Sequence, residues 1–137
     1  MSGTILVIGS TGTVGHDVVR GLAEAGREVR AATRDPATAR GREWTGRVRP
    51  VAFDYEVPAT WGPALEGVER VFLMARPGDD DADRHSIPFV DEAVRRGVRR
   101  VVALSALGVE RLPGMALRKI EVHVEASGLE WTFLRPN

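Results

Sequence analysis

Three glycines near the N-terminus, Gly9, Gly12 and Gly15, stand three residues apart. They follow an apolar run at residues 4–8 and open a helical pattern that stops at Gly26. A glycine-rich turn between a buried strand and a helix lets the backbone approach a phosphate, whose charge the free N–H groups of the first helical turn attract. We therefore predict that this loop binds a dinucleotide pyrophosphate, although a tight turn that binds nothing has the same pattern. The predicted contacts are Gly9, Thr11, Gly12, Thr13, Val14 and Gly15.

The residues after the second apolar run bear on the identity of the dinucleotide. Residues 28–33 predict a strand, and Arg34 and Asp35 follow it. An arginine at this place pairs with the 2′-phosphate of NADP(H), whereas an acidic residue accepts hydrogen bonds from the ribose 2′-hydroxyl of NAD(H). Arg34 comes first, so the sequence favours NADP(H). Asp35 keeps NAD(H) as the alternative.

Three more residues are candidates for cofactor contacts. Asp54 follows the strand predicted at residues 47–53, at a position suited to the adenine edge. Ala75 and Arg76 end the strand predicted at residues 70–75, beside the expected crevice. Solvated loop residues are an equally good interpretation of Asp54 and Arg76.

The elements that position these residues follow from an alternation of strand and helix patterns along the whole chain. The six expected strands are residues 4–8, 28–33, 47–53, 70–75, 99–105 and 130–134. Five helices are expected between the strands. The first follows Gly9, the second opens at Pro36, and the third is a weak turn over residues 58–65. The fourth begins at a Ser86 cap with Pro88 in its first turn, and the fifth spans residues 115–127. This alternation predicts an α/β fold: one Rossmann-type domain over residues 1–137, with three α/β/α layers and a parallel sheet in the order 3-2-1-4-5-6. The ligand crevice then lies between the first and fourth strands.

Composition excludes several other functions. The 137 residues contain no cysteine, which excludes disulfides, thiolate metal sites and cysteine nucleophiles. The formal net charge of zero argues against nucleic-acid binding through bulk charge. No apolar run approaches the roughly 18 residues of a membrane helix, and no signal peptide precedes the first strand, so we expect a cytoplasmic protein.

Three segments carry a family resemblance. They are residues 5–36 with the Gly-x-x-Gly-x-x-Gly loop, residues 101–108 with Leu-Ser-Ala-Leu-Gly, and residues 121–137 with Ser-Gly followed by Thr-Phe-Leu-Arg-Pro. Together they resemble the NmrA-like branch of the atypical short-chain dehydrogenase/reductases. The resemblance implies NAD(P) binding; some members resemble NAD(P)H quinone oxidoreductases or azoreductases, and others sense the redox state of the cofactor.

The resemblance also sets an expectation for the end of the chain. Members of that family continue past the Leu-Arg-Pro motif into a small lobe that covers the substrate, and no such lobe follows Asn137. We therefore expect a truncated product, whose uncovered surface would favour a homo-oligomer.

Short-chain dehydrogenases typically use a Tyr-x-x-x-Lys motif, in which the tyrosine donates a proton to a carbonyl oxygen and the lysine holds the nicotinamide ribose. The matching positions are Met115 and Lys119. Methionine cannot donate a proton, and the one tyrosine, Tyr55, follows the third strand on the adenine side. Ketone chemistry that depends on tyrosine is therefore not expected.

Other side chains remain as catalytic candidates. Lys119 is placed to hold the ribose, and His123, one turn further along the helix, to supply a proton. Ser105 ends the fifth strand, near where the family's catalytic serine or threonine lies. Solvated helix residues and an end-of-strand hydroxyl are the alternative interpretations of these three. The stripe of Leu117, Ile120 and Val124 is expected to be buried.

These observations favour hydride transfer from NADPH to a small-molecule acceptor that is quinone-like or otherwise conjugated. Such an acceptor takes a hydride into its conjugated system and can be protonated from water, so it needs no tyrosine. The alternatives are a non-catalytic NAD(P)-binding redox sensor or regulator, and an inactive fragment.

Overall fold

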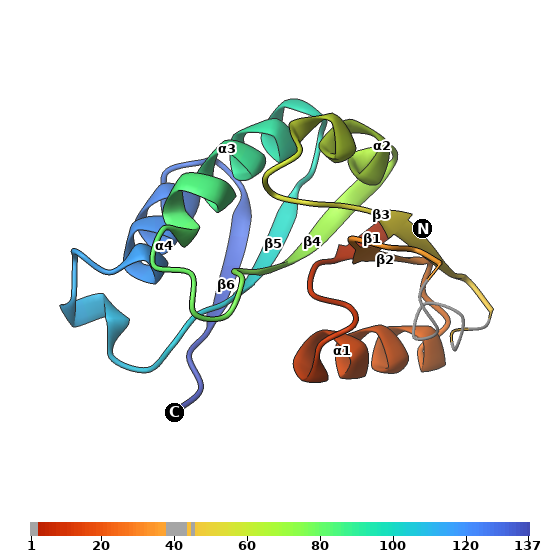
Figure 1. Cartoon of the computed structure of the whole chain (residues 1–137), viewed down its shortest axis with the longest axis horizontal. Helices are drawn as coiled ribbons and strands as arrows, with labels where there is room; N and C mark the ends of the chain where they lie inside the picture. The colour runs from red at the N-terminus through yellow and green to blue at the C-terminus, as the bar shows by residue number, and fades with distance from the viewer. Residues whose placement is uncertain (1–2, 38–43, 45) are drawn as a thin grey trace.

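The computed structural model describes residues 3–37, 44 and 46–137, and these residues form one parallel sheet in the order β3-β2-β1-β4-β5-β6 (Figure 1). The strands are β1 (Thr4–Val7), β2 (Val29–Thr33), β3 (Val48–Ala52), β4 (Val68–Met74), β5 (Arg100–Leu104) and β6 (Glu130–Leu134). Every neighbouring pair is parallel. The predicted α/β class, Rossmann-type architecture and strand order are confirmed.

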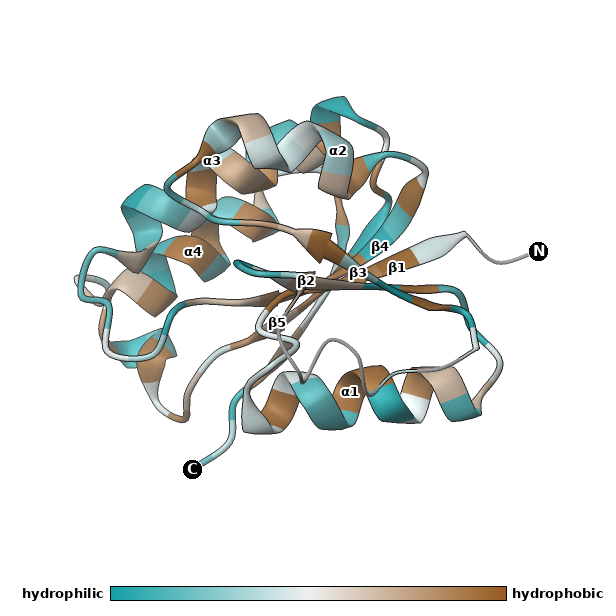
Figure 2. Ribbon diagram, turned by 45° about the vertical axis from the view of Figure 1, so that its right-hand side comes forward, coloured by the Kyte–Doolittle hydropathy of each residue, from teal (hydrophilic) through white to brown (hydrophobic). Residues whose placement is uncertain are grey.

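Helices cover the two faces of this sheet unequally. The α-helices are α1 (Thr13–Glu24), α2 (Trp61–Leu65), α3 (Ala82–Arg95) and α4 (Ala116–Glu125), and the 3-10 helices are η2 (Pro58–Thr60) and η3 (Val109–Arg111). Figure 2 shows α1 on one face and α2, α3 and α4 on the other. The cause is the strand order: the chain leaves β1 in one direction and β4 in the other, and right-handed crossovers then place the helices on opposite faces.

The apolar side chains of β1 supply both halves of the core. Leu6 is fully buried in the cluster beneath α2, α3 and α4, where Phe89 of α3 joins it. Val7 is fully buried on the opposite face, where Val19 of α1 joins it. Each such side chain contributes about 1.5–3 kcal/mol by leaving water. A strand that is buried on both faces has a continuous apolar sequence, which is why β1 could be predicted.

Helix α3 begins one turn earlier than the sequence predicts. Its first residue is Ala82, preceded by Asp81, so the expected N-cap role of Ser86 is wrong. Ser86 is buried inside the helix, and Pro88 lies in the interior rather than in the first turn. Val94 is exposed although its spacing from Val90 predicts an inward position, and the buried apolar residues are Ala82, Phe89, Val90 and Ala93. The backbone bond from the Ala82 N–H to the Asp79 carbonyl, 3.1 Å long, starts the turn within a segment whose acidic composition suggests a loop.

The helix predicted to open at Pro36 lies mostly outside the described residues. Pro36 and Ala37 form a turn after β2. The other predicted elements are present with small changes of boundary.

Two glycines of the loop are required by geometry. Gly9 has a positive φ of 73°, a conformation that L side chains rarely adopt. At Gly15, an added Cβ would lie 1.9 Å from the carbonyl oxygen of Gly9 and 2.5 Å from its carbonyl carbon. The first turn of α1 therefore packs directly on the backbone of the loop, and only glycine permits this contact.

We expect Gly15→Ala to destabilise the fold and Gly21→Ala to stabilise it slightly. The new methyl group at residue 15 would push the loop away from α1, at a cost of about 1–3 kcal/mol or more. Gly21 lies in the same helix with nothing within 4 Å of its added Cβ, so alanine there should add about 0.5–1 kcal/mol. Urea unfolding of both variants measures the difference. Equal stability of the two variants would contradict the close packing at Gly15.

Candidate functional site

Two hollows meet at the carboxyl ends of β1 and β4, where the strand order reverses. The first, the glycine-loop cleft, has a volume of about 240 Å³, and the second, the β5 cleft, has about 610 Å³. They share a common wall made of Met74, Ala75, Arg76 and Pro77. Ligands of open α/β sheets bind in the crevice at this switch point. The position predicted from the strand order is therefore hollow.

The glycine-loop cleft gathers most of the predicted cofactor residues. Its lining includes Gly9, Thr11, Gly12, Arg34, Asp54, Ala75 and Arg76. Thr13, Val14 and Gly15 do not line it; they form the first turn of α1, which Gly12 precedes without a side-chain cap. The N-cap residue Gly12 therefore offers no side-chain acceptor to the N-terminal N–H groups of α1. Such a helix end is suited to an anion.

A buried serine that sequence reasoning missed anchors this loop. Ser10 is fully buried, and its hydroxyl donates to the carbonyl oxygen of Ala32 in β2 over 2.6 Å. The bond ties the glycine loop to β2, the strand that Arg34 follows. A serine between two loop glycines gives no pattern that separates this role from a solvated one.

Arg34 and Asp35 point to different surroundings. Arg34 is exposed and lines the glycine-loop cleft, whereas Asp35 does not line it. The Asp35 carboxylate instead accepts a hydrogen bond from the backbone N–H of Ala37 over 3.0 Å. The cation after β2 therefore faces the cleft, and the carboxylate closes the following turn.

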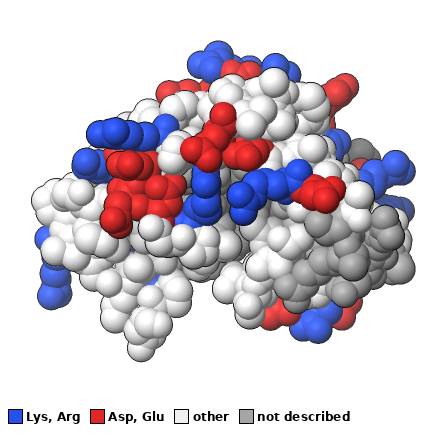
Figure 3. Space-filling model, in the orientation of Figure 1, with Lys and Arg blue, Asp and Glu red and all other residues white. Residues whose placement is uncertain are grey.

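Arg76 occupies the wall between the two clefts. Its guanidinium lies 3.1 Å from Glu56, and the other oxygen of Glu56 lies 3.8 Å from Nε2 of His85. Nδ1 of His85 is 2.8 Å from Asp79, and this hydrogen bond is the main reason why the pKa of Asp79 is lowered. Figure 3 shows acidic and basic side chains intermingled on this face rather than a patch of one sign.

Tyr55 is part of the core rather than a proton donor. It lines the glycine-loop cleft, but its hydroxyl donates to the carbonyl oxygen of Met74 over 2.9 Å. Burial raises its pKa, against smaller lowering effects of Ser86 and Arg76. Its ring contacts Phe53 and Phe89 edge to face. This environment keeps the phenol neutral and holds it in place.

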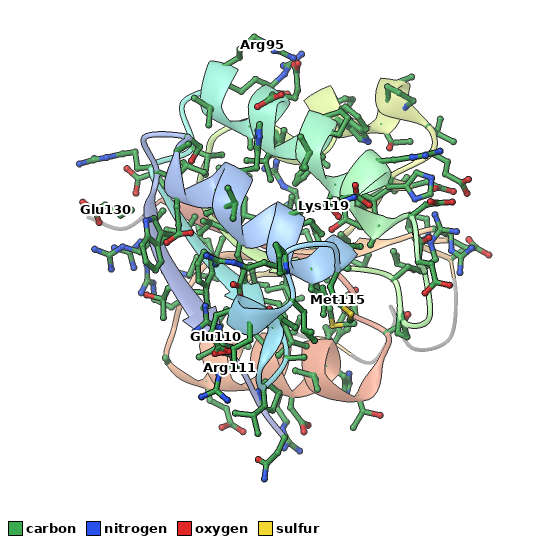
Figure 4. The ribbon with its side chains drawn as sticks, turned by 90° about the vertical axis from the view of Figure 1, so that its left-hand side faces the viewer. Arg95, Glu110, Arg111, Met115, Lys119 and Glu130 are labelled. Atoms are coloured by element: carbon green, nitrogen blue, oxygen red, sulfur yellow. The ribbon has the colours of Figure 1, made fainter. Side chains whose placement is uncertain are left out.

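The β5 cleft is mainly apolar. Apart from the shared wall, it is lined by the apolar Ala82, Leu104, Met115, Ala116 and Leu117, together with Gly78, Asp79, Asp80, Ser105 and Gly114. Met115 immediately precedes α4, at the position where short-chain dehydrogenases carry tyrosine (Figure 4). The cleft thus offers an apolar surface with a few polar groups at its rim.

The three predicted catalytic side chains do not meet in one place. Ser105 lines the β5 cleft, whereas Lys119 and His123 do not. The Lys119 amino group lies 3.9 Å from Asp83, and His123 Nε2 lies 2.6 Å from Asp91; both carboxylates belong to α3. The ribose-holding role of Lys119 and the proton-donor role of His123 stay predictions, and the ion pairs seen here direct both side chains toward α3.

Comparison with known proteins identifies the family. Residues 9–137 match a family model described as NAD(P)H-binding. The chain belongs to this NAD(P)H-binding family. The family resemblance predicted from the glycine loop, the 101–108 segment and the Leu-Arg-Pro ending is confirmed.

Several known proteins are similar to this chain in sequence. Prestalk A differentiation protein A of Dictyostelium discoideum is 38% identical over 97% of the chain and 44% of its own length. The NAD(P)H azoreductase of Xenophilus azovorans is 35% identical over 96% and 47%. A (4-alkanoyl-5-oxo-2,5-dihydrofuran-3-yl)methyl phosphate reductase of Streptomyces griseus is 39% identical over 96% and 46%. The chain spans less than half the length of these relatives.

Solved structures share the fold. Triphenylmethane reductase from Citrobacter sp., in complex with NADP(H), superimposes with a TM-score of 0.80 at 21% identity, over 96% of this chain and 48% of its own. NmrA, a negative transcriptional regulator, gives 0.83 at 21%, over 97% and 45%. An NADPH-dependent quinone oxidoreductase from Escherichia coli, in complex with NADPH, gives 0.76 at 25%, over 96% and 47%.

A buried ion-pair cluster in this family member escaped the sequence prediction. Glu121 is 1% exposed and lies on α4 beside the predicted apolar stripe. Arg135, just after β6, donates to both of its oxygens over 2.9 and 3.0 Å, and Arg118 donates to one over 2.9 Å. Burial raises the pKa of Glu121, but the hydrogen bonds from Arg135 and Arg118 and the nearby Ser105 hydroxyl outweigh it and lower the pKa to about 2. The arginine of the Leu-Arg-Pro motif was the one available signal.

Other kinds of site are absent from the part of the chain that the structure describes. No group of histidine, aspartate or glutamate side chains there could hold a metal ion. No helix within residues 3–37, 44 and 46–137 is both long and apolar enough to cross a membrane.

We expect Glu121→Gln to destabilise the fold at neutral pH and to lose its effect in acid. The Glu121 pKa falls from an ordinary 4.5 to about 2 on folding. A lowered folded pKa stabilises the fold fully above pH 4.5, and this contribution disappears as the pH falls towards 2. The difference between the two pKa values corresponds to roughly 3 kcal/mol, similar to the cost of breaking a buried pair.

Urea unfolding at several pH values measures this effect as the difference between wild type and variant. Glu125→Gln is the matched control, because Glu125 also contacts Arg118 but is 38% exposed on its side chain. Exposed pairs contribute about 0–1 kcal/mol. A wild-type advantage over Glu121→Gln that stays constant from pH 7 to pH 2.5 would contradict the assigned pKa.

Proposed function

We propose that this chain binds NADPH in the glycine-loop cleft and directs its hydride to a conjugated acceptor in the β5 cleft. The observation that carries the proposal is the common wall of the two clefts at Met74, Ala75, Arg76 and Pro77. A hydride moves only between groups in contact, so a cofactor cleft must open directly onto an acceptor cleft. The family membership supports the cofactor half of the proposal.

The residues of the glycine-loop cleft fit an anionic dinucleotide. The uncapped start of α1 offers N–H groups to a pyrophosphate, and Gly12 leaves room above them. Arg34 and Arg76 provide positive charge at the two ends of the lining. Asp54 accepts hydrogen bonds at the adenine side. When bound, NADPH supplies the hydride.

The placement of Arg34 supports NADPH over NADH. Its guanidinium is exposed at the cleft and has no ion pair among the described residues, so it is available to a 2′-phosphate. Asp35, the residue that would favour NADH, is held by the backbone N–H of Ala37. An arginine–phosphate bond of this kind discriminates by charge and by paired N–H donors.

The β5 cleft supports an acceptor with an extended apolar surface. Leu104, Met115 and Leu117 offer apolar side chains to such a surface. These three side chains carry no polar group that would need a hydrogen-bond partner. Met115 in place of tyrosine removes the usual proton donor. A quinone, azo or enone acceptor gains one hydride and then takes one proton from water, so the chain must orient the acceptor but need not protonate it. Supporting names are carried by the NAD(P)H azoreductase, the (4-alkanoyl-5-oxo-2,5-dihydrofuran-3-yl)methyl phosphate reductase and the NADPH-dependent quinone oxidoreductase, since each name gives an azo, dihydrofuran or quinone acceptor.

We expect Arg34→Ala to weaken NADPH binding by about 10- to 100-fold and NADH binding by less than about threefold. A hydrogen bond to a charged group contributes about 1.5–3 kcal/mol, and only NADPH carries the 2′-phosphate. Fluorescence titration with each cofactor measures the affinities. Arg49→Ala, which removes an exposed arginine of β3 outside both clefts, is the control. Equal losses for both cofactors would remove the NADP(H) assignment.

We expect NADPH to be oxidised in the presence of 1,4-naphthoquinone, as the fall in absorbance at about 340 nm measures. A larger residue at the apolar wall, Leu117→Trp, should raise the KM for the quinone because it fills the β5 cleft, and should leave NADPH binding unchanged. NADPH binding without turnover on quinone, azo and enone acceptors would contradict the reductase function.

A non-catalytic redox sensor is the second candidate. The observation that favours it is Met115 in place of the tyrosine at the β5 cleft, while the α3 carboxylates hold Lys119 and His123 away from that cleft. A sensor requires different affinities for the reduced and oxidised cofactor but no acceptor. Titration with NADPH and NADP⁺ beside the turnover assay separates the two functions.

A further inference from the structure

Two aromatic side chains of β6 stack on each other, and the second lies next to Arg135, which in turn bonds Glu121 of α4. Trp131 and Phe133 project to the α4 face of the sheet, with their rings stacked 4.5 Å apart. The Arg135 guanidinium lies 5.8 Å from the Phe133 ring and reaches Glu121 with two hydrogen bonds. Arg135 is therefore oriented by an aromatic ring on one side and a carboxylate on the other.

The backbone around Arg135 is bonded to the segment that follows β5. The Ser105 N–H donates to the carbonyl oxygen of Leu134 over 2.7 Å, and the Leu107 N–H donates to that of Pro136 over 3.1 Å. These two bonds flank Arg135 in the sequence. Holding Arg135 in place consequently holds residues 105–107.

That segment is part of the β5 cleft. Leu104 and Ser105 line the cleft directly. A smaller hollow adjoins the cleft, shares Ala75, Leu104, Ser105 and Leu117 with it, and includes Glu121 in its wall. The buried Ser105 hydroxyl makes no hydrogen bond of standard geometry, although it is near enough to Glu121 to help lower the pKa of that carboxyl. Glu121 thus lies behind residues that line the β5 cleft.

We propose that Glu121 is a positioning residue of the acceptor cleft, acting through Arg135 on the wall that contains Ser105. The proposal rests on the assignment of the β5 cleft to the acceptor. A buried carboxylate that receives donors from two arginine side chains fixes both the position and the rotation of the Arg135 fork. None of these residues lines the glycine-loop cleft, so the effect is confined to the acceptor side.

The first test is a comparison of kinetic parameters with NADPH and 1,4-naphthoquinone. Glu121→Gln and Arg135→Lys should raise the KM for the quinone about tenfold while the Kd for NADPH changes less than about twofold. Arg135→Lys retains the positive charge and loses the two-pronged geometry, so it tests the idea even if Glu121→Gln is too unstable to assay. Glu125→Gln, on the same helix, should leave both values unchanged.

Ser105→Ala tests the route of the effect. If Glu121 acts through the wall at Ser105, the double variant Ser105→Ala/Arg135→Lys should have the same quinone KM as the more impaired single variant, because two changes to one unit are not additive. Multiplied effects would show that Arg135 acts elsewhere and would overturn the proposed route.

Hydrogen exchange supplies a measurement that is independent of turnover. The amide hydrogens of Ser105 and Leu107 should exchange at least about tenfold faster in Arg135→Lys than in wild type, with the β1 amides unchanged. Unchanged exchange at both amides would overturn the proposal. So would a parallel loss of NADPH affinity, since that indicates a general loss of structure.

The failure of the reductase function is recognised separately. A wild-type chain without turnover, whose calorimetrically measured affinity for 1,4-naphthoquinone nevertheless falls in Arg135→Lys, would contradict hydride transfer and support the positioning role. Turnover by the wild type together with an unchanged quinone KM in the variants would support hydride transfer and contradict the positioning role. A wild-type chain that neither turns over nor binds the quinone would overturn both.

Discussion

Strand β1 is paired on both sides, and the site depends on this pairing. Residues 5–7 of β1 lie beside β2 on one edge and beside β4 on the other, and the Ile8 N–H continues the second pairing by donating to the Phe72 carbonyl oxygen over 3.1 Å. The loops that follow β1 and β4 therefore open side by side. Because α1 and α3 leave for opposite faces of the sheet, no helix fills the space between these loops. The glycine-loop cleft occupies that space, and the β5 cleft lies on the other side of the β4 loop, beside the end of β5.

Arg76 shows how the charges at this junction are arranged. Its pair with Glu56 is partly exposed, with 36% and 55% of the two side chains accessible, so it contributes at most about 1 kcal/mol. An anionic ligand in the glycine-loop cleft can recruit Arg76 from Glu56 at little cost. By contrast, two hydrogen bonds join Arg135, whose side chain is 31% exposed, to the buried carboxylate of Glu121, and separating them would leave that carboxylate without its main partner. The exposed pair of Arg76 suits exchange with a ligand, and the buried carboxylate of Glu121 suits a fixed wall.

The fold and most of the residues that line the glycine-loop cleft could be predicted because their signals are local. The apolar run of β1, the spacing of Gly9, Gly12 and Gly15, and the arginine after β2 each lie within a few residues. The start of α3 could not be predicted in the same way: proline at a first helical turn is common, but here backbone bonds at Asp79 start the helix earlier. Glu121 was missed because its burial depends on Arg135, fourteen residues away, and on the packing of α4 against β6. A single carboxylate in an amphipathic pattern is otherwise typical of a solvated face.

The two sides of the site are therefore specified by different parts of the chain. The glycine-loop cleft is built from residues 8–77. Its shape depends chiefly on the geometry of the loops and on their backbone N–H groups, so side chains elsewhere can change without altering it. The β5 cleft adds residues 78–117, and the contacts of α4 with the end of β6 hold its wall. A change of apolar side chain in that wall alters the shape offered to an acceptor without touching the cofactor loop. Under the proposed function, such a division allows one cofactor-binding half to serve different acceptors, in keeping with relatives that carry the names of different reductases.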